Sequence, residues 1–474
     1  MSKSTRNKII IALVIIALLA FAVFYFWSRN NDKQTNDGGF SSGSGGGSQS
    51  QSVFESFLSL VGLKEKDKNS NGTTTDGTGN IFPSGNNSSN NDDTDTATDI
   101  DFGFSSSASD ISQGSSSSSV FEAELPILRQ ISDSPVAGGI SFKRNDFTII
   151  RFVDRGTGHI FETNDRSLEN TMISNTTIPK VPEAVWTQNG QTVVLRYLDE
   201  NNGILSFSAN ILTATTSQDV SKNKKSAFLP SNIEQLSANP SGDKIFYLIN
   251  DAEGSVGSVS EVNGSKKKII FQSPIKEWLI SWTNDKIITL VTKPSFNVPG
   301  HLFFLNVKTG VMDKIMTGVN GLTALVSDNA KNILYSESVG SSVKLKYRNL
   351  ANGDDKDLSF KTLPEKCVWS KIEAFVAYCA VSTAIPNGEY PDGWYQGLIS
   401  FTDSVWKVNA KTGSSELVFD IQKETGNDID IMNPFLSDED EYLFFMNRKD
   451  LTLWSLAVKK QLSAKNFSED SDSF

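Results

Sequence analysis

The stretch "VWTQNGQTVVL", residues 185–195, decides the fold because its pattern returns along the last two thirds of the chain. It consists of an apolar segment, a polar turn that contains Asn, Asp or Gly, and a second apolar segment. This pattern is typical of two short strands joined by a tight hairpin turn. The other copies are "SFKRNDFTII", "SANPSGDKIF", "SWTNDKIITL", "LVSDNAKNIL", "VWSKIEAFVA" and "FLSDEDEYLF".

The copies recur at a spacing close to 44 residues. When they are aligned on one residue of the first strand, successive copies are separated by 44, 52, 44, 44, 43 and 67 residues. A repeat of this length with several strands in each unit indicates a β-propeller. The aligned residues are Phe142, Trp186, Ala238, Trp282, Val326, Trp369 and Leu436.

Two further strands follow each hairpin, separated by a turn that ends in glycine, as at Gly310 and Gly413. Seven units of four strands predict an all-β fold, a seven-bladed β-propeller of four-stranded antiparallel blades over residues 121–460. The last unit has only three strands before Val458. The segment "PILRQIS", residues 126–132, stands alone before the first unit, and we expect it to supply the missing strand and close the ring.

The units resemble the WD-repeat-like propeller repeats of the Tol-system periplasmic protein and of the prolyl-oligopeptidase families. The copy "LSANPSGDKIFYL" is the most similar to their consensus, with Pro240, Gly242, Lys244 and Ile245 in step. The resemblance covers about residues 125–460 and implies the propeller architecture. It leaves the function open, because propellers host many unrelated activities.

The chain begins with a candidate membrane anchor. Residues 9–27 form an uncharged, overwhelmingly apolar run that is long enough to span a bilayer as a helix. The denser positive charge of residues 1–8 predicts a cytoplasmic N-terminus and a propeller outside the cytoplasm. The alternative is a signal peptide cleaved after Ala22. We favour the uncleaved anchor, because apolar residues continue through Trp27.

Residues 28–120 have the composition of a disordered linker, rich in Ser, Gly, Asn and Asp. Residues 53–66 interrupt it, with apolar side chains at the spacing of one helix face. We expect either a transient helix without a partner or a docking helix. Residues 461–474 are expected to form an acidic disordered tail. The net charge of −11 argues against nucleic-acid binding.

The two cysteines, Cys367 and Cys379, flank a hairpin symmetrically about Glu373. Cross-strand neighbours are close enough for a disulfide, and an extracytoplasmic compartment would allow one to form. The alternative is a pair of buried thiols. No histidine lies nearby to complete a zinc site, so we expect no metal.

Catalytic motifs are absent from the sequence. His159 and His301 are the only histidines, and neither has a nucleophile and a carboxylate placed by a known motif. We therefore expect neither an enzyme nor a cofactor. A pair of carboxylates on the channel face remains the basis of an alternative interpretation as a hydrolase.

The binding site is expected on the propeller face where the connections between second and third strands emerge. Two of these connections are long, residues 292–301 and 382–403. Amphipathic aromatic rings are enriched at recognition hot spots. The alternative is that the rings hold the long loop onto its own blade. The candidate binding residues are Phe296, Tyr390, Asp392, Trp394, Tyr395 and Gln396.

Together these features predict a non-catalytic, single-pass membrane-tethered interaction module. Its expected partner is a protein or a glycan at the cell envelope, outside the cytoplasm. The alternatives are a propeller hydrolase that uses channel-face carboxylates, and a structural subunit of an envelope assembly.

Overall fold

The structure is a computed structural model that describes residues 125–187, 190–211 and 226–459. Within these ranges, no helix is both long enough and apolar enough to cross a bilayer. The predicted anchor at 9–27, the linker at 28–120 with its helix at 53–66, and the tail at 461–474 all lie outside the described residues.

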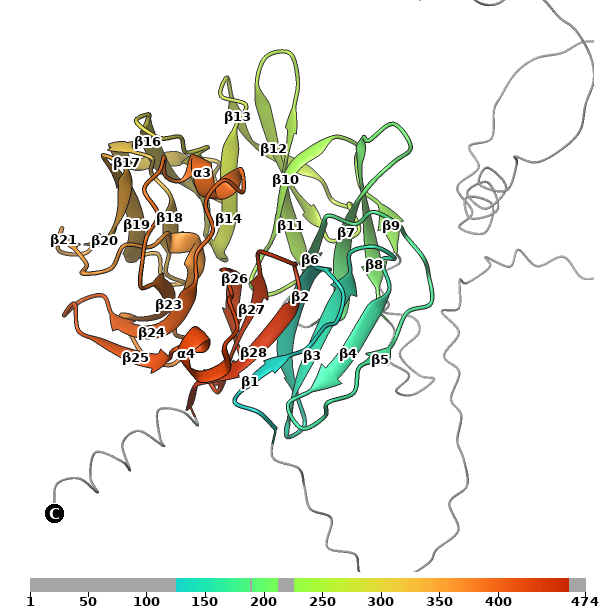
Figure 1. Cartoon of the computed structure of the whole chain (residues 1–474). Helices are drawn as coiled ribbons and strands as arrows, with labels where there is room; N and C mark the ends of the chain where they lie inside the picture. The colour runs from blue at the N-terminus through green and yellow to red at the C-terminus, as the bar shows by residue number, and fades with distance from the viewer. Residues whose placement is uncertain (1–124, 188–189, 212–225, 460–474) are drawn as a thin grey trace, which may run out of the picture. The chain divides into compact units, whose positions relative to one another are not determined.

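The described residues form seven four-stranded antiparallel sheets arranged in a ring, as the sequence predicts (Figure 1). Blade 1 contains β2 (Val136–Arg144), β3 (Phe147–Asp154), β4 (Ile160–Asn164) and β5 (Thr171–Met172). Blade 2 contains β6 (Glu183–Trp186), β7 (Thr192–Leu198), β8 (Ile204–Asn210) and β9 (Ala227–Phe228). Blade 3 contains β10 (Ile233–Ala238), β11 (Lys244–Asn250), β12 (Ser255–Glu261) and β13 (Lys268–Ser273). Blades 4 and 5 are β14 (Trp278–Asn284), β15 (Ile287–Thr292), β16 (Pro299–Asn306) and β17 (Met312–Asn320); and β18 (Ala324–Val326), β19 (Asn332–Val339), β20 (Ser342–Asn349) and β21 (Asp355–Asp357). Blades 6 and 7 are β22 (Cys367–Trp369), β23 (Val376–Ser382), β24 (Asp403–Asn409) and β25 (Ser415–Phe419); and β26 (Ile431–Leu436), β27 (Tyr442–Asn447), β28 (Leu453–Ala457) and β1 (Leu128–Gln130).

We name the strands of each blade a to d, from the channel outward. The a strands of neighbouring blades contact one another, as β2 does with β6 and β10 does with β14, and so they surround the channel. The b strands are buried on both faces because a blade packs on each side of them; β7 and β23 are examples. This double burial explains why their sequences are almost continuously apolar.

The ring is closed by β1, which forms strand d of the last blade. Leu128 pairs with Leu456 in an antiparallel ladder, which confirms the strand predicted from residues 126–132. The guanidinium of Arg129 is buried and donates a hydrogen bond to the carbonyl of Ser167 in blade 1 at 2.6 Å. Strand β1 therefore covers the edge of β28 and joins the two ends of the ring.

The aligned tryptophans pack between blades, as the repeat predicts. Trp186 and Trp282 are buried, and Trp369 is half-buried. The indole N–H of Trp186 donates to the carbonyl of Gly138 at 3.2 Å, and that of Trp369 donates to Leu325 at 3.3 Å. Both acceptors belong to the a strand of the preceding blade. The two indoles therefore join neighbouring blades by packing and by a hydrogen bond.

A small polar residue follows the aligned position and shapes the a–b turn. The Asn239 side-chain oxygen accepts a hydrogen bond from the backbone N–H of Lys244 at 2.8 Å. The Ser437 hydroxyl accepts one from the backbone N–H of Tyr442 at 3.0 Å. Such side-chain bonds replace backbone bonds in tight turns and keep the turns short. The same position holds Thr187, Thr283, Ser327 and Ser370.

Candidate functional site

The long connections emerge on one face of the propeller, as expected. The b–c and d–a connections lie on the side of the propeller where each a strand starts, and we call this side the loop face. The short a–b and c–d turns lie on the opposite side, the turn face. The b–c connection of blade 6 contains α3 (Asp392–Tyr395), and the d–a connections contain η2 (Pro364–Lys366) and α4 (Ile421–Thr425). These short helices were not predicted.

The blade 6 loop is held down by its own apolar side chains. Tyr390 has no exposed surface and Trp394 only 5%. Both belong to a buried cluster with Val343, Leu363, Ile399 and Phe401. For these two rings the alternative interpretation is therefore the right one. They pack the loop onto the protein and present little surface to a partner.

A fully buried ion network lies beneath α3. The ammonium group of Lys366 is 2.5 Å from Asp430 Oδ1 and 2.7 Å from Asp403 Oδ2, and none of the three side chains is exposed. Lys366 also donates to the carbonyl of Ile431 at 2.9 Å. Lys366 therefore joins the two d–a connections on either side of blade 6 to the end of the b–c connection of that blade. Removing that cation would leave two carboxylates buried and unpaired.

Trp394 connects this network to the loop. Its indole N–H lies 3.2 Å from each carboxylate oxygen of Asp430. The Lys366 ammonium lies 5.3 Å from the centre of the Trp394 ring and 4.6 Å from that of Phe401. Cation–π attraction strengthens when the cation is removed from water. The aromatic rings of the loop therefore stabilise the buried lysine as well as the apolar cluster.

Two carboxyl groups at the site hold protons more tightly than usual. Burial raises the pKa of Asp403, although the neighbouring Lys366 opposes the change, and Asp403 Oδ1 has no hydrogen-bond donor in the structure. Loss of solvation also raises the pKa of Glu365, which is half-buried in η2. The hydroxyl of Tyr395 donates to Glu365, and burial beside this carboxylate raises the pKa of Tyr395.

A second contact braces the loops of blades 4 and 6 against each other. Asp392 in α3 accepts a hydrogen bond from the Ser295 hydroxyl at 3.0 Å and another from the backbone N–H of Phe296. The blade 4 loop is also bonded to the connection between blades 4 and 5, where the backbone N–H of Gly321 donates to the carbonyl of Val298 at 3.1 Å. The two long loops therefore form one surface over blades 4 to 6.

The predicted binding residues divide into three groups by their exposure. Tyr390 and Trp394 are buried, whereas Asp392 and Phe296 are half-buried and form the brace between the loops. Tyr395 is 37% exposed, and Gln396 is exposed.

The most exposed apolar side chains of this surface are not among the residues predicted from the sequence. Leu398 is 78% exposed and Val298 is 52% exposed, and they stand on the blade 6 and blade 4 loops. The signal in the sequence was a single leucine placed after Gly397 within a polar loop tip. Together with Tyr395 and Gln396, these two side chains define what we call the loop patch.

Cys367 and Cys379 face each other on β22 and β23 and are joined by a disulfide. Both are buried, and Cys367 directly follows Lys366. The disulfide therefore lies at the beginning of strand a of blade 6, next to the ion network. Within the described ranges, no group of three His, Cys, Asp or Glu side chains is arranged to hold a metal ion.

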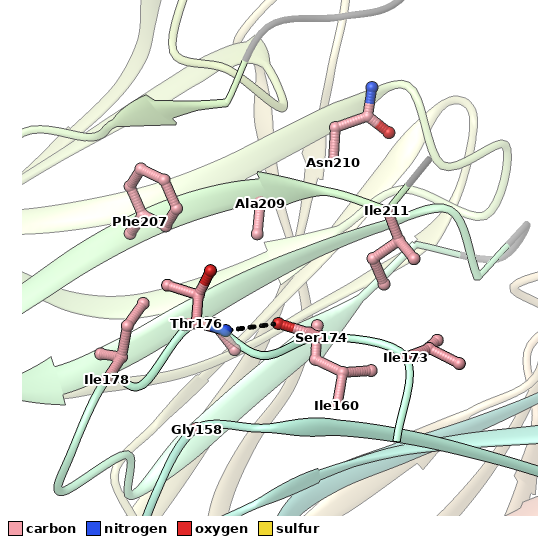
Figure 2. A pocket seen from close by; sticks show the side chains of 11 residues that line it. Gly158, Ile160, Ile173, Ser174, Thr176, Ile178, Phe207, Ala209, Asn210 and Ile211 are labelled. Atoms are coloured by element: carbon pink, nitrogen blue, oxygen red, sulfur yellow. Dashed lines mark hydrogen bonds between the residues drawn. The ribbon is translucent and has the colours of Figure 1, made fainter. Parts of the chain in front are cut away.

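A small cleft lies elsewhere, between blades 1 and 2 (Figure 2). Its volume of about 30 Å³ accommodates roughly two water molecules. The lining is mainly apolar, with Ile160, Ile178, Phe207 and Ile211 from the two blades. The few polar groups include Ser174, whose hydroxyl accepts a hydrogen bond from the Thr176 N–H at 3.4 Å. The cleft carries no charged group and gives no basis for chemistry.

Comparisons with known proteins concern the propeller fold. No family model and no curated protein matches the chain. TolB from Acinetobacter baumannii is 9% identical with a TM-score of 0.38, over 59% of this chain and 62% of that chain. An oligogalacturonate lyase in complex with manganese is 10% identical with a TM-score of 0.47, over 70% of this chain and 93% of that chain.

A third similar structure is the β-propeller domain of the Trilobed protease from Pyrococcus furiosus. It is 12% identical with a TM-score of 0.43, over 68% of this chain and 95% of that chain. These neighbours agree with the resemblance to Tol-system and peptidase-type propellers noted in the repeats. At 9–12% identity these likenesses concern the fold alone.

Proposed function

We propose that this protein is a non-catalytic recognition module that binds a protein partner through the loop patch. The observation that carries the proposal is the pairing of exposed apolar side chains with a rigid support. Leu398 and Val298 stand exposed on loops that are braced together by Asp392. Exposed apolar side chains held at fixed positions are typical of surfaces that bind other proteins.

The rigid support favours binding by lowering its entropic cost. Loops that are ordered before a partner arrives lose less conformational freedom on association. The buried network around Lys366 fixes the base of the blade 6 loop, and the apolar cluster around Trp394 fixes its middle. Tyr395, Gln396 and Leu398 at its tip are exposed.

We place this module outside the cytoplasm, tethered by residues 9–27. The apolar run and its flanking charges support the tether. The Cys367–Cys379 disulfide supports an oxidising compartment, because such bonds rarely persist in the cytoplasm. A glycan is the alternative ligand, since Tyr395 and Gln396 together offer an aromatic face and an amide.

A hydrolase is the second candidate, and one observation favours it. Glu365 is half-buried, its pKa is raised by loss of solvation, and it accepts a hydrogen bond from Tyr395. A carboxylic acid of this kind can serve as a proton donor in glycoside hydrolysis. A saccharide-hydrolysis screen with wild type and Glu365→Gln tests this function, because an activity lost only in the variant would establish it.

The recognition function is tested by proximity labelling on intact cells. Wild type is compared with Leu398→Ser/Val298→Ser, which removes exposed apolar surface from the loop face. The matched control is Ile372→Ser/Val311→Ser on the turn face, where the two side chains are 57% and 55% exposed. We expect a protein partner that is retained by the control and lost by the loop-face variant. A partner captured equally by all three proteins would overturn the proposal.

A further inference from the structure

The ion network beneath α3 contains two carboxyl groups and one ammonium group. Asp403, Asp430 and Lys366 have no exposed side-chain surface, and we call them the buried triad. If all three groups carried their usual charges, the triad would hold one unbalanced negative charge away from water. Such a charge is so costly that a buried group usually takes up or releases a proton instead. The hydrogen bonds of the three groups indicate which of them holds the additional proton.

Lys366 is the cation of the triad. An ammonium group has three N–H donors and no acceptor. In the structure it meets three acceptors, which are Asp430 Oδ1 at 2.5 Å, Asp403 Oδ2 at 2.7 Å and the carbonyl of Ile431 at 2.9 Å. Each donor therefore has one acceptor, as expected of a protonated lysine.

Asp430 is bonded as an ionised carboxylate. Its Oδ1 accepts a hydrogen bond from Lys366 and lies 3.2 Å from the indole N–H of Trp394. Its Oδ2 accepts from the backbone N–H of Phe401 at 3.1 Å and from the Ser400 hydroxyl at 3.3 Å. Donors at both oxygens favour the charged form of a carboxyl group.

Asp403 has donors at only one of its two oxygens. Oδ2 accepts from Lys366 and, at 2.7 Å, from the backbone N–H of Ile431. No group of the described residues bonds to Oδ1, although this atom is buried. The charged form would leave negative charge on an oxygen without a donor, whereas the neutral form places its O–H there. Burial raises the pKa of Asp403, in agreement with the neutral form.

Other charged groups on the surrounding elements are in contact with solvent. Lys366 and Asp430 are the ionisable groups whose charge changes the pKa of Asp403. The others are exposed or half-buried, so water and salt screen them. They are Glu365 in η2, Asp392 in α3, Lys423 and Glu424 in α4, Asp428, and Arg448 after β27.

We infer that the buried triad binds one proton, on Asp403, and that this proton makes the triad a pH-sensitive latch for the blade 6 loop. With the proton, the triad holds one positive and one negative charge. Loss of the proton leaves two carboxylates in the interior to share a single ammonium group. The loop depends on the same groups, because the Trp394 indole bonds to Asp430 and its ring lies over Lys366. The loop should therefore loosen as the pH rises, whether or not the loop patch binds a partner.

The test compares Asp403→Asn with Asp430→Asn. Both carboxyl groups are fully buried and contact Lys366, so a merely structural role predicts similar losses of stability. Asparagine at 403 imitates a neutral carboxyl group, whereas asparagine at 430 removes the anion that balances Lys366. Both changes are made in Glu365→Gln, because Glu365 also has a raised pKa. Urea unfolding between about pH 5 and pH 9 gives the equilibrium constants of unfolding.

We expect Asp430→Asn to raise the unfolding constant at pH 7 at least about tenfold more than Asp403→Asn does. Because the folded-state pKa of Asp403 is raised, its contribution to stability is complete below the ordinary aspartate pKa. That contribution is lost as the pH rises through the folded-state value. The unfolding constant of the Glu365→Gln parent should therefore rise relative to that of Asp403→Asn, by up to about tenfold per pH unit. Parallel pH profiles, or equal effects of the two asparagines, would overturn the inference.

Hydrogen exchange of the wild-type full chain gives a second test, which does not depend on the folding of a variant. The amides of the blade 6 loop around Trp394 are compared with those of β7 in blade 2, after correction for the intrinsic effect of pH on exchange. We expect the loop to lose protection between about pH 6 and pH 9 while β7 keeps it. Unchanged protection of the loop would overturn the inference. The labelling experiment with Leu398→Ser/Val298→Ser is done at one pH, so the recognition function stands or falls separately.

Discussion

The ammonium group of Lys366 lies 2.5 Å from Asp430 Oδ1, and neither side chain has any exposed surface. The two residues directly precede the a strands of neighbouring blades and are 64 positions apart in the chain. Their pairing joins the d–a connections on both sides of blade 6. The indole of Trp394 bonds to the same aspartate, so the long loop above is fixed to this pair.

Replacing Lys366 with Met should be strongly destabilising, because it leaves Asp403 and Asp430 buried without a cation. The expected loss in the free energy of unfolding is about 3–5 kcal/mol, the usual cost of removing one partner of a buried ion pair. Urea unfolding monitored by tryptophan fluorescence measures it. The control is Lys293→Met, which breaks an exposed pair with Glu277 and should cost much less. Equal losses in the two variants would show that the buried network does not anchor blade 6.

Replacing Trp186 with Ala should destabilise the protein by about 3–5 kcal/mol through a cavity between blades 1 and 2. The variant Trp186→Phe keeps most of the ring volume and loses only the bond to the Gly138 carbonyl. Its expected cost is therefore smaller, about 1–2 kcal/mol. Chemical denaturation of both variants gives the comparison. Similar costs for Ala and Phe would mean that the hydrogen bond, and not packing, dominates at this position.

Removing the disulfide by Cys367→Ala/Cys379→Ala should lower the free energy of unfolding by about 3 kcal/mol. The two residues are 12 positions apart, and the bond reduces the entropy of the unfolded chain by closing this loop. Unfolding of wild type under reducing conditions should approach that of the double variant. Identical stability of wild type and variant under oxidising conditions would indicate that the thiols are not bonded in solution.

Glu365 should make the protein less stable as the pH rises. Because its folded-state pKa is raised by loss of solvation, the folded protein binds this proton more tightly than the unfolded chain does. The contribution is complete below the ordinary glutamate pKa and is lost as the pH rises through the folded-state value. Melting temperatures between about pH 4 and pH 8 should therefore fall for wild type relative to Glu365→Gln.

Asp428 serves as a control, because its contribution to stability should change with pH in the opposite direction. A hydrogen bond from Lys449 lowers its pKa, so its stabilising contribution is present above the ordinary aspartate pKa and is lost as the pH falls through the folded-state value. Wild type should therefore lose stability relative to Asp428→Asn on acidification. The same slope for both variants would contradict the assignment of these two environments.

A chain that begins at Asp133 should be less stable and more prone to aggregate than the full chain. It lacks β1, so the edge of β28 is exposed and the contact between Arg129 and blade 1 is lost. Melting temperature and light scattering measure the two effects. Adding a synthetic peptide of residues 125–132 should partly restore the melting temperature; a deletion without any effect would contradict ring closure by this strand.

The blades were predictable because the repeat makes each local signal visible several times. The aligned tryptophans, the small polar residues that follow them, and the isolated segment at 126–132 all follow from short-range patterns. The contact between Lys366 and Asp430 was not predictable in this way. It depends on where two loops meet after the ring has closed, and no spacing in the sequence encodes that distance.

The place of the long loop at 382–403, between the second and third strands of blade 6, could be predicted from loop length and repeat order. Which of its side chains are buried could not. Trp394 and Tyr390 were expected to offer a binding surface, but a loop of this length needs an apolar core of its own, and these rings supply it. Leu398 was missed because a lone leucine at a loop tip has no periodic neighbours that mark it as exposed.

The most direct measurement of the central claim is crosslinking of the labelled partner to lysines, followed by mass spectrometry. Exposed lysines mark both faces, with Lys276, Lys293 and Lys361 on the loop face and Lys286, Lys331 and Lys371 on the turn face. The loop-patch account predicts crosslinks at the first group and few at the second. Crosslinks concentrated at Lys286, Lys331 and Lys371 would contradict it.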